Sequence, residues 1–151
     1  MAGLHLMIDG TYGKPITAEV IEDLFTDVIA LSGMTAITPR EIAWQGAPCR
    51  GWHGFQLLAE SHVTFHAHED IRYCFLDLFS CKEFDTRSVK ELVVDRLGLT
   101  EERVRVVKRQ GIDGSAEAEV PLEWPESEVW ALDHTKGRLG VSEGHLEERV
   151  L

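Results

Sequence analysis

Alternation between apolar and polar residues predicts a series of short strands in the part of the chain before Gly111. Runs that are apolar throughout, or that alternate with a period of two, are typical of β-strands. The chain contains five such runs, at residues 5–8, 55–59, 61–67, 72–80 and 103–108. In the third run, His62, Thr64 and His66 share one face, and Val63 and Phe65 share the other.

Two stretches between these runs are expected to be less regular. Residues 35–44 have strand-forming side chains but contain Pro39, which restricts a strand to a sheet edge. Residues 45–54 contain three glycines and a proline, and this composition predicts a loop. A turn is expected at Glu69 and Asp70.

Apolar residues at helical spacing predict two helices. The first begins after a Thr17 N-cap and ends at Gly33. Its apolar positions are Val20, Ile21, Leu24, Val28, Ile29 and Leu31. The second is capped by Asp85 or Thr86 and followed by Gly98. Its buried stripe is Val89, Leu92, Val93 and Leu97.

The order of these elements favours an α+β fold. Strands and helices do not alternate strictly, and neighbouring strands in the middle of the chain are placed as hairpins. We therefore expect an antiparallel sheet with two helices on one face, rather than a parallel α/β fold. The other face of such a sheet needs cover, and a second protomer in a homodimer is a natural candidate.

Length, composition and charge limit the classes of function. The 151 residues are 44% hydrophobic, which suits one domain with a real core. The chain lacks an apolar run of the roughly eighteen residues that span a membrane. It has no basic stretch at its start that would indicate a secretory signal, and its three cysteines are expected to be free thiols in a cytoplasmic protein. A net charge of −11 argues against nucleic-acid and anionic-membrane partners.

The negative charge is concentrated near the end of the chain. We divide the sequence into a domain at residues 1–110 and an acidic, partly ordered C-terminal extension at residues 111–151. A solvated acidic tail accounts for this composition. Recruitment of a cationic substrate is the alternative.

The residues with the most distinctive chemistry lie around Ser61. A serine hydroxyl can attack the carbonyl of the preceding peptide bond, here that of Glu60, to give an ester. Removal of the Cα proton by a base such as His66 then splits the chain and leaves a pyruvoyl group at the former Ser61. A pyruvoyl carbonyl accepts a substrate amine and takes up the electrons released as CO₂ leaves, and Cys81 is the candidate acid that returns a proton to the product.

The segments Leu58-Ala59-Glu60-Ser61-His62-Val63-Thr64-Phe65-His66 and Leu76-Asp77-Leu78-Phe79-Ser80-Cys81 resemble the processing and active-site motifs of the bacterial and archaeal S-adenosylmethionine decarboxylase proenzymes. The resemblance extends over about residues 4–110. It implies cleavage between Glu60 and Ser61, a self-derived pyruvoyl cofactor, a processing role for His66 and a proton-donating role for Cys81. It also implies an αββα sandwich dimer and conversion of S-adenosylmethionine to its decarboxylated form and CO₂ in polyamine biosynthesis.

The sequence departs from this family in the substrate pocket. His53 stands where the family has a serine that helps processing, and Asp70 stands where it has a glutamate. Ala47 and His68 replace the two aromatic residues that stack on adenine, although Trp44 and Trp52 flank the loop and are candidates to compensate. This pattern leaves open an arginine or ornithine substrate. The acidic candidates to bind its distal charge are Asp9, Glu69 and Asp70, beside His68.

Two further classes of function remain open from the sequence. His62, His66, His68 and Asp70 have the same strand parity, and such a set can bind a metal ion, although the decarboxylase interpretation predicts none. An uncleaved, non-catalytic paralogue is the other alternative, with His53 in place of serine as its main support. Arg50 and Arg72 are candidates to bind a substrate carboxylate, or to form surface ion pairs.

Overall fold

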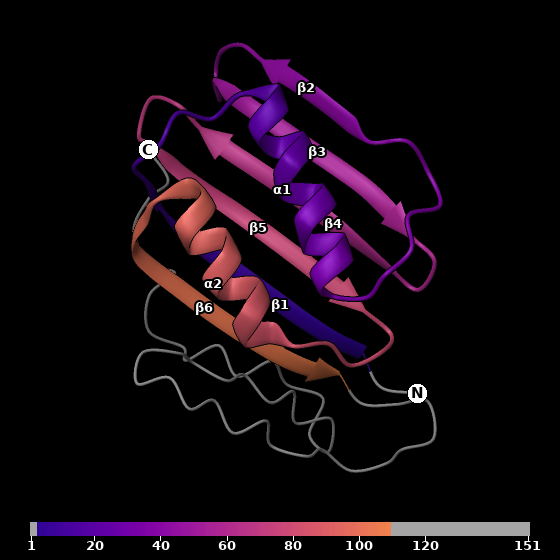
Figure 1. Ribbon diagram of the computed structural model, residues 1–151. Helices are drawn as coiled ribbons and strands as arrows, with labels where there is room; N and C mark the ends of the chain where they lie inside the picture. Colours follow the sequence, from indigo (N-terminus) through magenta and orange to yellow (C-terminus); the bar gives the residue numbers. More distant parts are fainter. Residues whose placement is uncertain (1–2, 110–151) are drawn as a thin grey trace, which may run out of the picture.

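The computed structural model describes residues 3–109, which form one six-stranded antiparallel sheet with two helices packed on one face (Figure 1). The spatial order of the strands is β2-β3-β4-β5-β1-β6. The elements in chain order are β1 (Gly3–Tyr12), α1 (Ala18–Leu31), β2 (Glu41–Gln45), β3 (Gly51–Leu58), β4 (Ser61–His68), β5 (Tyr73–Ser80), α2 (Thr86–Leu97) and β6 (Leu99–Arg109). The predicted α+β class and the placement of both helices are confirmed. The C-terminal extension at 111–151 lies outside the described residues.

Both helices begin with the caps that the sequence predicts, and α2 also ends at the predicted glycine, whereas α1 ends at Leu31 with Ser32 as its C-cap, just before Gly33. The Thr17 side chain accepts a hydrogen bond from the backbone N–H of Val20 at the start of α1. At the start of α2, the Asp85 carboxylate accepts from two backbone N–H groups, and Gly98 ends the helix in the left-handed conformation. Most of each predicted apolar stripe is buried, with Val20 and Leu92 partly so. The prediction is wrong for Leu31, which is 46% exposed at the end of α1.

The hydrophobic core lies between the helices and one face of the sheet. Every second residue of the central strands points into it, which is the alternation expected for a sheet covered on one side. Its fully buried members include Leu6, Ile8, Phe25, Phe65, Leu76 and Leu78. The opposite face, called here the open face, has no helix over it in the described part of the chain. Phe55, Leu57 and Phe75 are 38%, 40% and 36% exposed on that face.

The prediction of a loop at residues 45–54 is wrong at both ends. Strand β2 continues to Gln45, and β3 begins at Gly51. Two of the three glycines serve close packing within β3: a Cβ on Gly51 would lie 1.7 Å from the Ala67 carbonyl oxygen, and one on Gly54 would lie 2.9 Å from Ile21 Cγ2.

Two other strands are longer than the sequence patterns suggest. Strand β1 does not stop at Asp9 but continues to Tyr12, with a shift of register against β6 between Asp9 and Thr11. Strand β6 starts directly after α2, at Leu99. The stretch at residues 35–44, expected to be an edge strand or irregular, is partly a strand: β2 begins at Glu41, after Pro39, and among the described strands it pairs only with β3 at the edge of the sheet.

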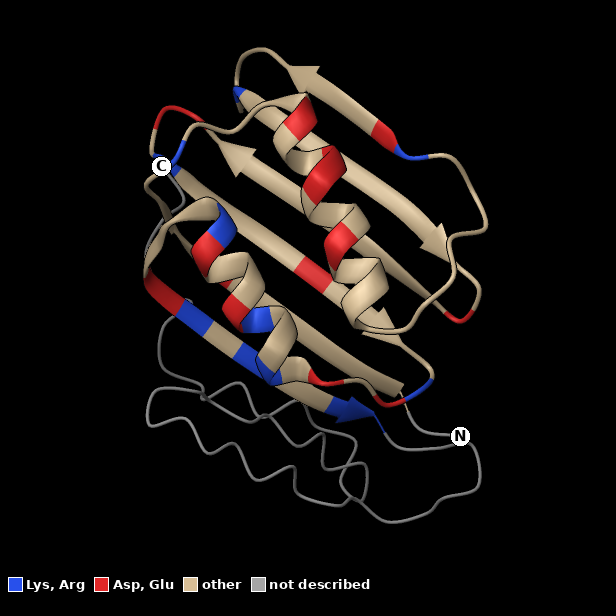
Figure 2. Cartoon of the chain, in the orientation of Figure 1, with Lys and Arg blue, Asp and Glu red and all other residues tan. Residues whose placement is uncertain are grey.

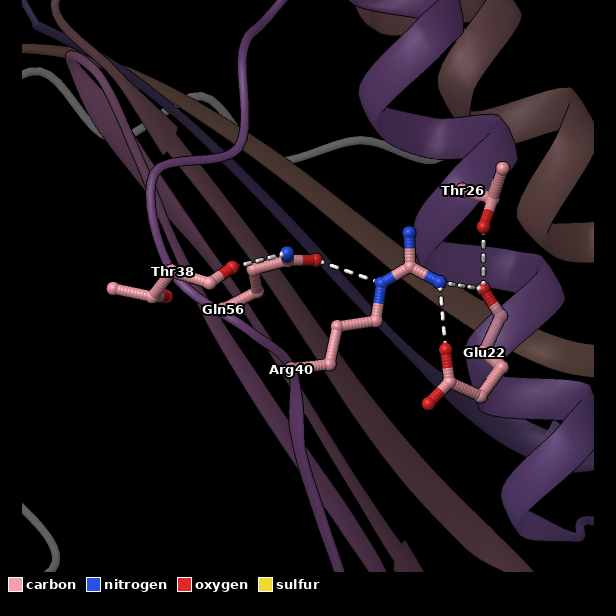
Figure 3. A network of polar contacts seen from close by, with 5 residues as sticks. All are labelled: Glu22, Thr26, Thr38, Arg40 and Gln56. Atoms are coloured by element: carbon pink, nitrogen blue, oxygen red, sulfur yellow. Dashed lines mark hydrogen bonds and ion pairs between the residues drawn. The ribbon is translucent and has the colours of Figure 1, made fainter.

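A polar network joins α1 to β3 and the segment before β2 (Figure 3). Arg40 donates from Nε to Gln56 Oε1 at 2.8 Å and from Nη1 to the Glu22 carboxylate at 2.8 Å. Gln56 is only 4% exposed, and its amide donates to the Thr38 carbonyl oxygen. This buried amide is therefore satisfied at both ends, as a polar side chain in a core must be.

Charged residues are distributed unevenly over the elements. Acidic residues recur along α1, whereas on β6 the basic residues outnumber the acidic ones (Figure 2). The negative charge that argues against nucleic acid is therefore also present on the exposed side of α1.

Within residues 3–109, no helix is both long and apolar enough to cross a membrane.

Candidate active site

The tight turn between β3 and β4 holds the peptide bond of interest. Leu58 and Ser61 pair across this hairpin, so Ala59 and Glu60 form the two-residue turn. The Glu60 carbonyl oxygen accepts a hydrogen bond of 3.0 Å from the backbone N–H of Cys81. A hydrogen bond to this oxygen draws electrons from the carbonyl carbon and makes it more open to attack.

The Ser61 hydroxyl lies beside that carbonyl. Its Oγ is buried and has no hydrogen-bond partner among the described residues. Leu58 and Ser80, the two cross-strand partners of Ser61, are both buried on the helix-covered face, so Ser61 belongs to the same face. A buried hydroxyl without a partner is costly in a folded protein and is therefore a sign of a functional constraint.

Residues Glu60, Ser61 and Cys81 are brought together, but His66 is not. His66 pairs with His53 and Phe75 and lies on the open face, opposite to Ser61. Five residues of extended strand separate Ser61 from His66, which places their Cα atoms about 17 Å apart. Within one chain, His66 therefore cannot reach the Cα proton of Ser61.

His66 belongs instead to a cluster of imidazoles near the end of β4. His53 Nδ1 lies 2.7 Å from His66 Nδ1, and the ring of His68 lies edge-on to that of His53, with 6.2 Å between centroids. The pKa of His66 is lowered, mainly by burial and then by the nearby His53, while Asp77 opposes the shift. His66 is therefore held toward its neutral, basic form.

The acidic candidates are already paired with arginines. Asp9 is 8% exposed, and its carboxylate accepts from Arg105 at 2.8 Å. Glu69 and Asp70 lie in the turn after β4, as predicted, and contact Arg50 at 3.3 and 3.6 Å. A cationic substrate would have to compete with these arginines for any of the three carboxylates.

Trp44 and Trp52 cannot stand in for aromatic residues on the open face. They pair across β2 and β3, with ring centroids 5.5 Å apart, and Trp52 packs against the core on the helix side. They line a cavity of about 270 Å³ together with Tyr12 and Arg72. Compensation by these two rings is therefore not supported for a ligand bound beside His66.

The residues of the metal-binding alternative are spread along β4 and the turn after it. No group of three potential metal ligands is assembled within residues 3–109. His62 lies near the other end of β4, where its ring packs against that of Phe79 at 5.5 Å. The three cysteines are free, with Cys49 exposed, Cys74 buried and Cys81 partly exposed.

Two features of the site were not found from the sequence. The first is the hydrogen bond from the Cys81 backbone, because a main-chain donor leaves no mark on residue type. The second is a pair of open-face contacts: His5 Nε2 lies 2.9 Å from an Asp77 carboxylate oxygen, and Arg105 binds Asp9. The alternation of Arg103 and Arg105 on β6 is the sequence signal for the contact with Asp9.

Comparison with known proteins identifies the chain's relatives. Residues 5–110 match the family model described as S-adenosylmethionine decarboxylase. An S-adenosylmethionine decarboxylase proenzyme from Geobacillus sp. (strain WCH70) is 30% identical over 80 residues, which are 53% of this chain and 62% of that protein. A proenzyme of the same name from Anoxybacillus flavithermus (strain DSM 21510 / WK1) is 28% identical over 94 residues, or 62% of this chain and 73% of that protein.

A solved structure supports the fold. The crystal structure of the adenosylmethionine decarboxylase from Aquifex aeolicus VF5 superimposes with a TM-score of 0.60 at 21% identity, and covers 77% of this chain and 97% of that one. At this identity the likeness concerns the arrangement of helices and strands.

Proposed function

Because the chain belongs to the S-adenosylmethionine decarboxylase family, we propose that it is a self-processing, pyruvoyl-dependent decarboxylase whose substrate is S-adenosylmethionine. One observation supports this most directly. The carbonyl of Glu60 accepts a hydrogen bond from the Cys81 N–H, next to a buried Ser61 hydroxyl that has no partner within residues 3–109, at the position of the family's processing motif.

Processing starts from these atoms. Ser61 Oγ attacks the Glu60 carbonyl carbon, and the oxyanion that develops receives the hydrogen bond from the Cys81 N–H. The bond from the Glu60 carbon to the Ser61 nitrogen breaks, the nitrogen gains a proton, and an ester links the two residues. A base then removes the Ser61 Cα proton, the Cβ–O bond breaks, and Glu60 leaves as a carboxylate. Loss of ammonia by hydrolysis completes the pyruvoyl end, which supplies an electrophilic carbonyl for the substrate amine.

The separation of Ser61 from His66 favours a site built from two protomers. Apolar side chains of the open face, among them Phe55, Leu57 and Phe75, need cover from water. A second copy packed on this face gives the αββα sandwich expected of the family. In that arrangement, His53 and His66 of one protomer approach the turn at Glu60 and Ser61 of the other from its open face. This is the side of the Ser61 Cα–H bond, because the Ser61 side chain points to the helix-covered face. The homodimer would then supply the base that one chain lacks.

The substrate pocket supports a second candidate. Ala47 and His68 stand at the two adenine-stacking positions, and loss of stacking costs roughly 1–3 kcal/mol per base. Decarboxylation needs only an α-amino acid, so arginine or ornithine is the alternative substrate. Its distal charge would lie near His68 and the carboxylates of Glu69, Asp70 or Asp9.

The experiment measures release of labelled CO₂ from S-adenosylmethionine, arginine and ornithine by the purified protein. We expect release from S-adenosylmethionine, and none after Ser61→Ala. Release from arginine or ornithine alone would replace the proposed substrate, and release from none of the three would refute the activity.

A complementation test addresses the two-protomer site. Ser61→Ala and His66→Ala chains, each uncleaved alone, are co-expressed with different tags. A shared site predicts that the His66→Ala chain is cut, because it offers Ser61 to a partner with an intact His66. If neither chain is cut in the mixture, the site does not span two protomers.

A further inference from the structure

The contact between His53 and His66 has a definite proton arrangement. A distance of 2.7 Å between two Nδ1 atoms is a hydrogen bond, so one ring bears the proton and the other offers a lone pair. Only one of the two rings can therefore be in its Nδ1–H tautomer when both are neutral. The contact joins neighbouring strands, because His53 and His66 are cross-strand partners in β3 and β4.

The direction of this hydrogen bond decides whether His66 can act as a base. If His53 donates, the Nδ1 lone pair of His66 is occupied and its Nε2 bears a proton, so no nitrogen of His66 is free. If His66 donates, its Nε2 has a free lone pair, and the ring, although partly desolvated, still has exposed surface on the open face where a second protomer would lie. A processing role for His66 thus requires that it donate to His53.

We propose that His53 is a positioning residue, which holds His66 in the Nδ1–H tautomer and shares the proton that His66 Nε2 removes from carbon. The inference rests on the proposed function. When Nε2 takes the Cα proton of the partner's Ser61 ester, the Nδ1 proton of His66 moves toward His53 Nδ1, and the positive charge is spread over two rings. The electron pair of the broken C–H bond forms the Cα=Cβ bond as Glu60 departs.

The remaining nitrogen of His53 is compatible with this assignment. His53 Nε2 is buried and has no partner among the described residues, and in the proposed tautomer it bears the single N–H proton of that ring. A serine can accept a hydrogen bond from an imidazole but cannot hold its charge, because the hydroxyl is far too weakly basic. With histidine instead of serine at position 53, this chain therefore has two hydrogen-bonded imidazoles that can share a proton, in place of a single basic imidazole.

The charged and titratable groups around the pair come from three strands. His53 lies on β3, His68 lies beside it on β4, and Asp77 acts from β5. His68 packs edge-on against both His53 and Phe75, which keeps the rings in place. The carboxylate of Asp77 favours a proton on His66, whereas partial desolvation and the two nearby histidines oppose it, so the pKa of His66 is lowered and its neutral form is favoured.

The test reads the tautomer and the rate separately. Full-length Ser61→Ala protein with ¹⁵N-labelled histidine stays uncut, and its imidazole nitrogens report which atom bears the proton. We expect the Nδ1–H tautomer for His66. We expect it to be lost in Ser61→Ala His53→Phe, which removes the acceptor, and kept in Ser61→Ala His53→Asn, whose side-chain oxygen can accept.

Processing rates are measured for the same changes with Ser61 intact. His53→Phe should slow cleavage by on the order of 10²-fold, the usual contribution of a positioned base, and His53→Asn should restore part of the rate. An unchanged rate in His53→Phe, or an Nε2–H tautomer of His66 in the parent, would overturn the inference while leaving the decarboxylase proposal intact. Stoichiometric zinc or nickel in the purified protein would also overturn it, since a metal would replace the shared proton. Failure of the decarboxylase proposal gives a different result: the chain with Ser61 intact is not cleaved, although His66 has the predicted Nδ1–H tautomer.

Discussion

At the scale of single residues, reactivity depends on what surrounds each group. Ser61 and Ser80 are cross-strand partners, yet only Ser80 Oγ has a hydrogen bond, which it accepts from the Lys82 backbone N–H. Ser61 Oγ has none among the described residues and lies beside a carbonyl that the Cys81 backbone polarises. The difference between two serines of one face therefore arises from the turn geometry and not from residue type.

The three thiols should differ in the same way. Burial raises the pKa of Cys74 to about 12, with a further contribution from Asp9, so this thiol stays protonated at ordinary pH. We expect iodoacetamide at pH 8 to label exposed Cys49 first, Cys81 more slowly, and Cys74 only after denaturation. Mass spectrometry of tryptic peptides measures this order. Rapid labelling of Cys74 in folded protein would contradict the packing of β5.

Most residues of the candidate site could be identified from the sequence, but the contacts between them could not. The motif around Ser61 and Cys81 is visible in the chain because it depends on residue identity at fixed spacing. The contact of His53 with His66 depends on strand register, and the residues expected to form a loop include the start of β3. The pairing could therefore not be seen before the strand was placed.

At the scale of elements, close packing of α1 against β3 explains why glycine occurs inside a strand. The ring of Phe25 and the branched side chain of Ile21 occupy the space that a Cβ on Gly54 would need. Patterns of hydrophobicity predict the helices well, because capping and apolar spacing are local. They fail for β3, because the requirement for glycine comes from a helix more than twenty residues away.

Replacement of Gly54 by alanine should measure that packing. The new Cβ would lie 2.9 Å from Ile21 Cγ2 and 3.1 Å from Phe25 Cζ, so we expect a loss of about 1–3 kcal/mol in the free energy of unfolding. Denaturation by urea measures it. Gly46→Ala is the matched control, since nothing lies within 4 Å of its Cβ position. Equal stability of the two variants would show that α1 does not press on β3.

At the scale of the whole molecule, the open face bears the histidines from which a response to pH is expected. Two histidines on this face, His62 and His66, have lowered pKa values, in each case mainly because burial disfavours the charged form. The unfolded chain therefore binds protons on these residues at a higher pH than the folded one. The contribution of these two histidines to the free energy of unfolding is therefore complete above their ordinary pKa of 6.5, and it is lost as the pH drops toward the lowered pKa values.

Thermal unfolding at fixed protein concentration, from pH 7.5 down to pH 5, tests this. We expect the melting temperature to fall on acidification, and to fall less in His62→Asn His66→Asn, which lacks both groups. The comparison is made in the Ser61→Ala background so that cleavage does not contribute. An equal fall in both proteins would assign the acid sensitivity to other residues.

The central claim is that the peptide bond between Glu60 and Ser61 breaks itself. Intact mass spectrometry of freshly purified protein, beside a Ser61→Ala control, tests it most directly. The account predicts two fragments, residues 1–60 and a second beginning with a pyruvoyl group at position 61, while the control keeps its full length. A wild-type chain that persists at its full 17.0 kDa would contradict it.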